Sequence, residues 1–162
     1  MKYAGLIQDD FVDGEGVCTS FWVQGCPLHC HGCHNPQTWD PEGGELLPDN
    51  YLDLIDKAIT ANGLLRNFSL LGGEPFAWYN RKLSCNILRH VRNKFPTIKI
   101  FCWTGYTLDQ IKMVAAIDKE AQQMLECIDI LIDGAYLEEQ RDVSLHLRGS
   151  RNQQIRYKGV DF

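Results

Sequence analysis

Three cysteines lie close together near the start of the sequence. Cys26, Cys30 and Cys33 fall within eight residues, directly after Gly25. Thiolates this close in sequence can all bind one metal centre, and no fourth cysteine is nearby. In a 4Fe–4S cluster, three cysteine ligands leave one iron available to bind a substrate. Catalytic zinc sites keep one coordination position open, and we expect the same of a catalytic 4Fe–4S cluster. The spacing therefore favours a catalytic iron–sulfur cluster.

A structural zinc ion is the alternative for the same loop. His29, His31 and His34 stand beside the cysteines, and each offers a nitrogen as a fourth ligand. The spacing alone favours the iron–sulfur cluster over zinc, and the rest of the chain decides between the two interpretations. Two other cysteines, Cys85 and Cys102, lie in apolar stretches and are interpreted as buried, unreactive thiols.

A second group of residues, Gly72-Gly73-Glu74-Pro75, follows an apolar stretch at 68–71. Neither glycine carries a Cβ, so the backbone at this point can approach a ligand closely. Glu74 and the neighbouring carbonyls offer hydrogen-bond acceptors, and Pro75 stiffens the turn. No Lys-Ser or Lys-Thr pair follows, which excludes a phosphate-binding P-loop. The alternative is an ordinary turn between a strand and a helix.

The elements that position these residues follow from the apolar pattern. It predicts strands at 19–23, 68–71, 98–103 and 128–132, a weaker strand at 154–157, and helices at 49–61, 78–95 and 107–126. The last helix opens with a capping box of Thr107 and Gln110, and we expect a break near Asp118. Trp22 and Trp103 are interpreted as core residues of their strands. Trp39 is interpreted as an anchor of the loop that carries the cysteines.

The alternation of strands and helices predicts a parallel sheet with right-handed crossovers. In such folds the ligand binds at the carboxyl ends of the strands, where the cysteines, the Gly-Gly-Glu-Pro turn and Thr104 all fall. The chain is too short for the ~250 residues of a complete eightfold barrel. We therefore expect an α/β fold that forms a short, incomplete (β/α) barrel with parallel strands.

Length and composition limit the functions that need consideration. The 162 residues predict a single domain that spans residues 1–162. A formal net charge of -5 provides no general positive field, which argues against a nucleic-acid partner. No apolar run approaches the ~18 residues that span a membrane, and the N-terminus shows no secretion signal. We expect a cytoplasmic protein with no membrane partner.

The cysteine loop and the later Gly-Gly-Glu-Pro turn, each at the end of a predicted strand, together resemble the motifs of the radical S-adenosylmethionine enzymes. Further segments are similar to the subgroup that activates glycyl-radical enzymes, at residues 13–16, 21–25, 33–35, 38–39, 104–106, 129–134 and 148–153. The resemblance implies that Cys26, Cys30 and Cys33 hold three irons of a 4Fe–4S cluster. It implies that S-adenosyl-L-methionine binds the fourth iron and is cleaved by one electron from the reduced cluster.

The resemblance also implies which residues contact S-adenosylmethionine. Gly72, Gly73 and Glu74 are expected at its methionine group, where Glu74 and the exposed carbonyls accept hydrogen bonds from the ammonium. Thr104 is expected at its ribose or adenine, with a role at the start of the following helix as the alternative. The segment Gly32, Cys33 and His34 is expected to contact the adenine through its backbone. Gly32 departs from the family, because many members carry an aromatic residue there.

The short length narrows the resemblance to activases of anaerobic ribonucleoside-triphosphate reductase. It implies a glycyl radical on the large subunit of the reductase, a low-potential electron donor, and either a homodimer or a heterotetramer with the reductase. Arg148, Arg151 and Asn152 are candidates to bind that partner, with a solvated polar tail as the alternative. The competing functions are another small radical S-adenosylmethionine enzyme, a zinc-binding interaction module and an electron-transfer protein.

Overall fold

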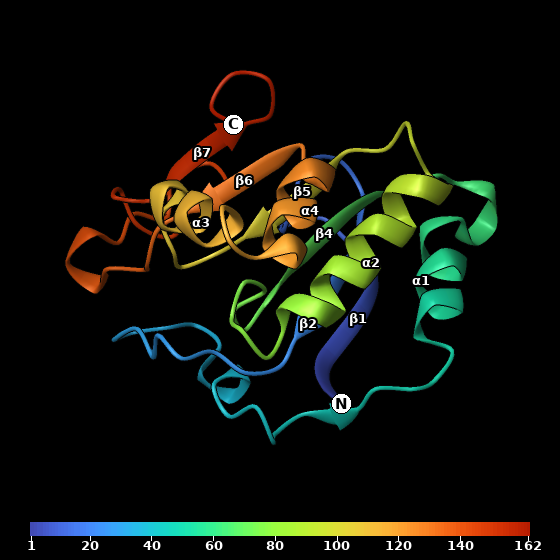
Figure 1. The fold of residues 1–162 in the computed structure, drawn as a ribbon, viewed down its shortest axis with the longest axis horizontal. Helices are drawn as coiled ribbons and strands as arrows, with labels where there is room; N and C mark the ends of the chain where they lie inside the picture. The colour runs from blue at the N-terminus through green and yellow to red at the C-terminus, as the bar shows by residue number, and fades with distance from the viewer.

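A computed structural model describes residues 1–162, and Figure 1 shows one sheet with helices packed against it. In chain order the strands and helices are β1 (Lys2–Asp10), β2 (Cys18–Val23), η1 (Pro36–Thr38), β3 (Glu45–Leu46), α1 (Tyr51–Ile59), η2 (Ala61–Gly63), β4 (Asn67–Gly72), α2 (Arg81–Lys94), β5 (Ile100–Trp103), α3 (Leu108–Ala115), α4 (Lys119–Cys127), β6 (Ile130–Asp133), η3 (Glu138–Gln140) and β7 (Gln154–Tyr157). No helix combines the length and the apolar character needed to cross a lipid bilayer.

The sheet has seven strands in the order β3-β1-β2-β4-β5-β6-β7. Its centre, β2, β4, β5 and β6, is parallel as predicted. The prediction of an all-parallel sheet is wrong at the edges, where β1 runs antiparallel to β2 and β7 antiparallel to β6. The short loop at 11–17 can only reverse the chain, because a parallel connection needs a crossover of a dozen or more residues. The sheet stays open because its two edge strands, β3 and β7, do not pair.

The two faces of the sheet are covered differently. One face packs against the helices in a core of 22 buried residues, which includes Phe21, Leu70, Cys102 and Leu131. Successive strand residues point to opposite faces, so their neighbours project from the other side. That side holds a smaller buried cluster of Cys18, Phe101, Ile130 and Ile132. The helix-free face therefore keeps room for a site.

Most of the predicted elements are confirmed, with boundaries shifted by a few residues. Thr107 and Gln110 form the capping box at the start of α3, and the break near Asp118 separates α3 from α4. Asp118 caps α4 by accepting a hydrogen bond from the Ala121 amide at 2.8 Å. Cys85 and Cys102 are buried, as expected. The pattern missed β1, because this strand shows no regular alternation and gains its pairing only from β2 and β3.

Candidate functional site

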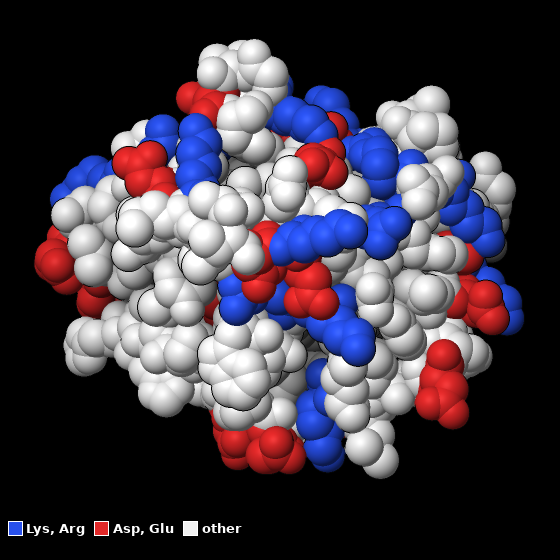
Figure 2. All heavy atoms as spheres, viewed as in Figure 1, with Lys and Arg blue, Asp and Glu red and all other residues white.

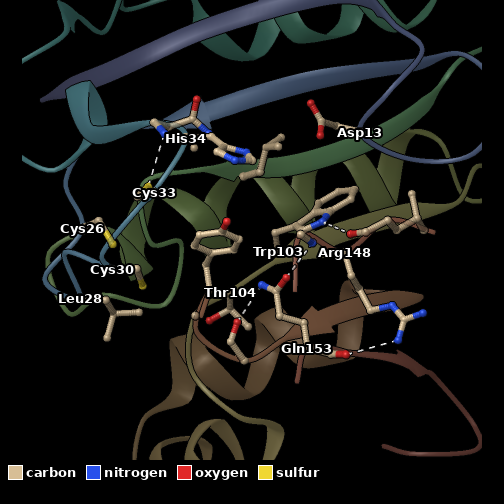
Figure 3. A pocket seen from close by; sticks show the side chains of 18 of the residues that line it. Asp13, Cys26, Leu28, Cys30, Cys33, His34, Trp103, Thr104, Arg148 and Gln153 are labelled. Atoms are coloured by element: carbon tan, nitrogen blue, oxygen red, sulfur yellow. Dashed lines mark hydrogen bonds between the residues drawn. The ribbon is translucent and has the colours of Figure 1, made fainter. Parts of the chain in front are cut away.

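The sequence motifs meet at a cavity of about 520 Å³ on the helix-free side of the sheet (Figure 3). Its walls come from the loops that follow β2, β4 and β5 and from the segment 134–153. All but one of the residues predicted to bind a metal or cofactor line this cavity, namely Cys26, Cys30, Cys33, His34, Gly72, Gly73, Glu74 and Thr104. The exception is Gly32. The parallel centre of the sheet therefore brings the separate motifs together as predicted.

The three cysteines stand at one end of the cavity. All three thiols are unpaired and half-buried, and Figure 3 shows them around a common space. Burial raises the pKa of the Cys26 thiol, and nearby Glu74 adds to the effect. A positively charged metal centre at this position would stabilise the thiolate form. The donor set, three thiols around a space, fits an iron–sulfur cluster.

The zinc alternative finds less support in the arrangement of the histidines. No three His, Cys, Asp or Glu side chains, the three thiols included, stand close enough together to hold a single metal ion. Of the three histidines in the loop, only His34 lines the cavity. The His29 ring stacks on Trp39 instead, with the ring centroids 4.6 Å apart, and His31 is exposed. Trp39 thus anchors the cysteine loop, as predicted.

Backbone hydrogen bonds fix the start of the cysteine loop against the segment around η1. The amide of Gly25 donates to the Thr38 carbonyl at 2.7 Å, and the amide of Cys26 donates to the Trp39 carbonyl at 3.0 Å. Further along, the backbone amide of Asn35 donates to the Cys33 sulfur at 3.4 Å. Such N–H···S contacts stabilise thiolates and tune the potential of a bound cluster.

The two glycines of the Gly-Gly-Glu-Pro turn are required by the chain itself. Gly72 has φ +106°, and a Cβ there would lie 2.7 Å from the Val23 carbonyl oxygen. A Cβ on Gly73 would collide with the carbonyl oxygen of Gly25. The turn therefore packs directly behind the start of the cysteine loop. Gly73 lines the cavity, and its carbonyl accepts no hydrogen bond from the chain.

Glu74 is the most buried charged residue of the site, with 1% of its surface exposed. Its Oε1 accepts hydrogen bonds from the Phe76 amide at 2.9 Å and the Thr104 hydroxyl at 2.7 Å, and its Oε2 accepts one from the Gly105 amide at 2.7 Å. Burial raises the pKa of Glu74 to about 7, although these three donors act in the opposite direction. The carboxylate therefore ties the end of β4 to the end of β5.

Thr104 also connects the end of β4 to the end of β5. Its hydroxyl donates to Glu74 and accepts a hydrogen bond from the Tyr106 amide at 3.2 Å, while its own amide donates to the Ile132 carbonyl. Both the hydroxyl and the amide are thus engaged by the chain. The side chain is 4% exposed but borders the cavity.

The end of the cysteine loop faces the segment that follows β6. The His34 ring packs against Tyr136 with centroids 5.4 Å apart, and the Tyr136 hydroxyl donates to Glu138 at 2.7 Å. Gly32 has φ +77°, and a Cβ there would collide with the Glu138 carboxylate. Glu138 therefore lies directly against the loop at Gly32, which is outside the cavity.

Several cavity residues were not predicted. Trp22 and Trp103 were expected in the core but are half-buried and line the cavity, because strand alternation turns them away from the helices. The alternation itself contained this signal, since Trp22 lies between the helix-facing residues Phe21 and Val23. Asp13 lines the cavity at the end away from the thiols (Figure 3).

The polar tail after residue 136 is a folded wall of the cavity. The Trp103 indole donates to the Leu147 carbonyl at 2.9 Å. The Gln153 side chain accepts from the Gly149 amide at 2.8 Å and donates to the Gly134 carbonyl at 2.9 Å. Arg148, a candidate for partner binding, also lines the cavity. Its position could not be found from the sequence, because these contacts join distant segments.

Comparison with known proteins agrees with this arrangement. The family described as a 4Fe-4S single cluster domain matches residues 12–156. The anaerobic ribonucleoside-triphosphate reductase-activating protein of Haemophilus influenzae is 37% identical over 160 residues, which cover 96% of this chain and 97% of the relative. The proteins of the same name from Enterobacteria phage T4 and Escherichia coli K12 are 32% and 31% identical, over 96% and 97% of this chain and 93% and 99% of theirs.

These relatives match almost from end to end, so the likeness covers the cysteine loop, the Gly-Gly-Glu-Pro turn and the wall at 134–153 alike. The chain therefore belongs to the family of anaerobic ribonucleoside-triphosphate reductase-activating proteins and carries its 4Fe-4S single cluster domain.

Proposed function

We propose that this protein activates an anaerobic ribonucleoside-triphosphate reductase by generating a glycyl radical on its large subunit. The observation that carries the proposal is the meeting of three unpaired thiols and the Gly-Gly-Glu-Pro turn at one cavity, in a chain of this family. We further propose that residues 1–162 work as one domain, and that the open sheet is an incomplete (β/α) barrel of the radical S-adenosylmethionine type.

We assign the cluster to Cys26, Cys30 and Cys33. When bound, the reduced 4Fe–4S cluster supplies the electron that cleaves S-adenosylmethionine, which is the source of the radical. The loop holds the three sulfurs at the cavity end, and the Asn35 amide directs a hydrogen bond to one of them. All seven cysteines are unpaired in the structure, which supports the proposal of a reducing, cytoplasmic setting.

We assign the S-adenosylmethionine site to the walls next to the thiols. The Gly73 carbonyl is an acceptor for its ammonium group, because the carboxylate of Glu74 is already occupied by three donors of the chain. Gly72 and Glu74 then hold the shape of the turn, and Thr104 holds Glu74. Cys33 and His34 line the cavity and, with the neighbouring Gly32 outside it, are assigned to the adenine.

The protein substrate reaches the site from the far end of the cavity. Asp13 lies there, and Val12 and Val143 line the cavity while exposing 80% and 85% of their surfaces. A glycine-bearing segment of the reductase can enter between these residues, and Arg148 in the wall offers a donor to its carbonyls. The electron donor and the assembly with the reductase, as a homodimer or a heterotetramer, stay predictions.

The test is anaerobic reconstitution with iron and sulfide, followed by incubation with S-adenosylmethionine, dithionite and the reductase. We expect a glycyl radical signal in electron paramagnetic resonance. Cys30→Ala removes one cluster ligand and should abolish both the iron and sulfide content and the signal. Cys127→Ala, a buried thiol on α4, is the matched control and should keep both.

Two results would contradict the proposal. One is a reconstituted protein that holds zinc without iron or acid-labile sulfide, which would support the zinc-binding module. The other is an intact cluster that cleaves S-adenosylmethionine but leaves the reductase without a radical, which would indicate a different substrate for the same chemistry.

A further inference from the structure

A second groove lies outside the site, between the start of α2 and α3. It has a volume of about 270 Å³ and is lined mainly by apolar side chains, Phe76, Trp78, Arg81, Tyr106, Gln110, Ile111 and Val114. Trp78 exposes 77% of its surface, and Met113 and Ile117, on and just beyond α3, are also largely exposed. An exposed tryptophan beside an apolar groove is typical of a protein-docking surface.

The groove is close to the proposed cluster ligand Cys26. Trp78 packs edge-on against Tyr79, with ring centroids 5.3 Å apart. The Tyr79 ring in turn lies against Gly25, since a Cβ on Gly25 would be 2.6 Å from the Tyr79 ring carbon Cε2. Two hydrogen bonds to the Gly25 carbonyl, from the Glu74 amide at 2.9 Å and the Asn80 side chain at 3.1 Å, fix this contact. One aromatic ring thus separates the surface residue Trp78 from the start of the cysteine loop.

The outer surface of α2 next to the groove is positively charged. The helix contains five lysines and arginines and no aspartate or glutamate, in a chain whose net charge is -5. Three of the five pair with carboxylates of other elements, which leaves Lys82 and Arg89 exposed without an ion-pair partner. These two are seven residues apart and so share one face of the helix. Figure 2 shows basic side chains in the region of α2, with acidic side chains of neighbouring elements beside them.

We propose that the groove beside Trp78 and the face of α2 with Lys82 and Arg89 form the docking surface for the electron donor, a small acidic one-electron carrier of low potential. This inference rests on the proposed function. The reduced carrier gives up one electron, the oxidised cluster gains it, and no bond forms or breaks. The positive face attracts the acidic carrier, and the apolar groove holds it near Cys26.

The position of this surface allows both partners to bind at once. The substrate cavity opens on the helix-free side of the sheet, between Val12 and Val143, whereas the groove lies among the helices on the other side. Electron transfer weakens steeply with distance, so the carrier must approach the cluster closely. A carrier at the groove meets this need without displacing the reductase.

The test measures binding of an acidic ferredoxin and an acidic flavodoxin, both oxidised, to the reconstituted protein at low ionic strength. We expect Lys82→Glu/Arg89→Glu and Trp78→Ala each to raise the Kd of at least one carrier tenfold or more. Lys57→Glu on α1 and Phe11→Ala in the loop after β1 are matched exposed controls, and both should leave the Kd unchanged. Added salt should raise the Kd of the carrier for the wild type. It should also reduce the difference in Kd between the wild type and Lys82→Glu/Arg89→Glu.

The same variants separate this inference from the proposed function. With dithionite, a small reductant that needs no docking surface, they should still form the glycyl radical. If the wild type forms no glycyl radical with dithionite, the proposed function is contradicted. The docking proposal is then tested by the Kd values of the two carriers alone. The docking proposal is overturned if the wild type binds neither carrier, if the variants bind as the wild type does, or if they lose the reductase instead.

Discussion

The two loops that form the end of the cavity with the three thiols are built in opposite ways. The cysteine loop after β2 has no regular secondary structure up to η1, and its histidines His29, His31 and His34 are exposed. The turn after β4 is buried, with Glu74 bound to three donors and Asn80 to two carbonyls. One loop presents reactive groups to the cavity, and the other holds the framework.

This difference indicates that the turn after β4 contributes to folding stability and that the cysteine loop serves to bind the metal centre. The turn after β4 is complete without any ligand, because nearly all of its polar groups find partners in the chain. The cysteine loop has few such partners, so a bound cluster would supply much of its order. Changes in the turn should therefore cost folding stability, and changes in the loop should cost the metal centre.

The largest effect is expected for Glu74→Ala. It leaves the Phe76 amide, the Gly105 amide and the Thr104 hydroxyl without a partner in a buried site. We expect the cluster-free protein to lose about 3–5 kcal/mol of unfolding free energy, measured by chemical denaturation. Cys33→Ala in the other loop should cost less than about 1 kcal/mol. Equal losses in the two variants would refute the contrast between the loops.

The pH dependence of stability should also originate in the turn. Burial raises the pKa of Glu74 to about 7 from its usual 4.5, so folding takes up a proton between these values. The stability present below pH 4.5 is therefore lost as the pH rises to 7, by roughly 3 kcal/mol. Denaturation of the cluster-free protein across this range should show a shallower fall for Glu74→Gln.

Asp13 titrates in the same window, because burial and then the neighbouring Asp10 raise its pKa to about 7. Asp13 contributes to the pH dependence of stability equally in the wild type and in Glu74→Gln. The difference between their curves of unfolding free energy against pH therefore reports Glu74 alone. Identical curves would show that folding does not raise the pKa of Glu74.

A pair of glycine variants sharpens the comparison. Gly73→Ala pushes a methyl group into the rigid carbonyl of Gly25, and we expect a loss of about 2–3 kcal/mol in the cluster-free protein. Gly32→Ala meets only the end of the flexible Glu138 side chain, although its φ of +77° adds strain, so the loss should be about 1 kcal/mol. Thermal melting measures both, and the reverse order would contradict this account.

The smallest effect on folding is expected for His29→Asn. Asparagine tolerates the φ of +46° at this position, so the change removes mainly the stack on Trp39. We expect a cost of about 0.5 kcal/mol in the cluster-free protein. The reconstituted variant should nevertheless release iron to a chelator faster than the wild type, because the stack holds the cysteine loop. An unchanged release rate would show that the stack has no part in retaining the cluster.

Prediction from the sequence succeeded where local patterns carry the information. The capping box at Thr107, the break at Asp118 and the strand β7 are all where the sequence indicated. It failed for β1, and for Trp22 and Trp103, which line the cavity instead of joining the core. The pairing of β1 with β2 and β3 is a tertiary contact that a local pattern does not contain. The alternation along β2 does place Trp22 opposite the helix-facing residues, but only the fold shows that this face of the sheet borders a cavity.

The sequence by itself determined the family and the parallel centre of the sheet, and it predicted the three cysteine ligands, because cysteine spacing and the alternation of strands and helices are local properties. Only the tertiary structure decided that the sheet stays open, that Glu74 is bound to Thr104 and Gly105, and that the tail closes the cavity wall. Each of these depends on hydrogen bonds or packing between segments 30 or more residues apart, such as the 2.7 Å contact from Thr104 to Glu74. Such contacts arise only when the folded chain brings those segments together.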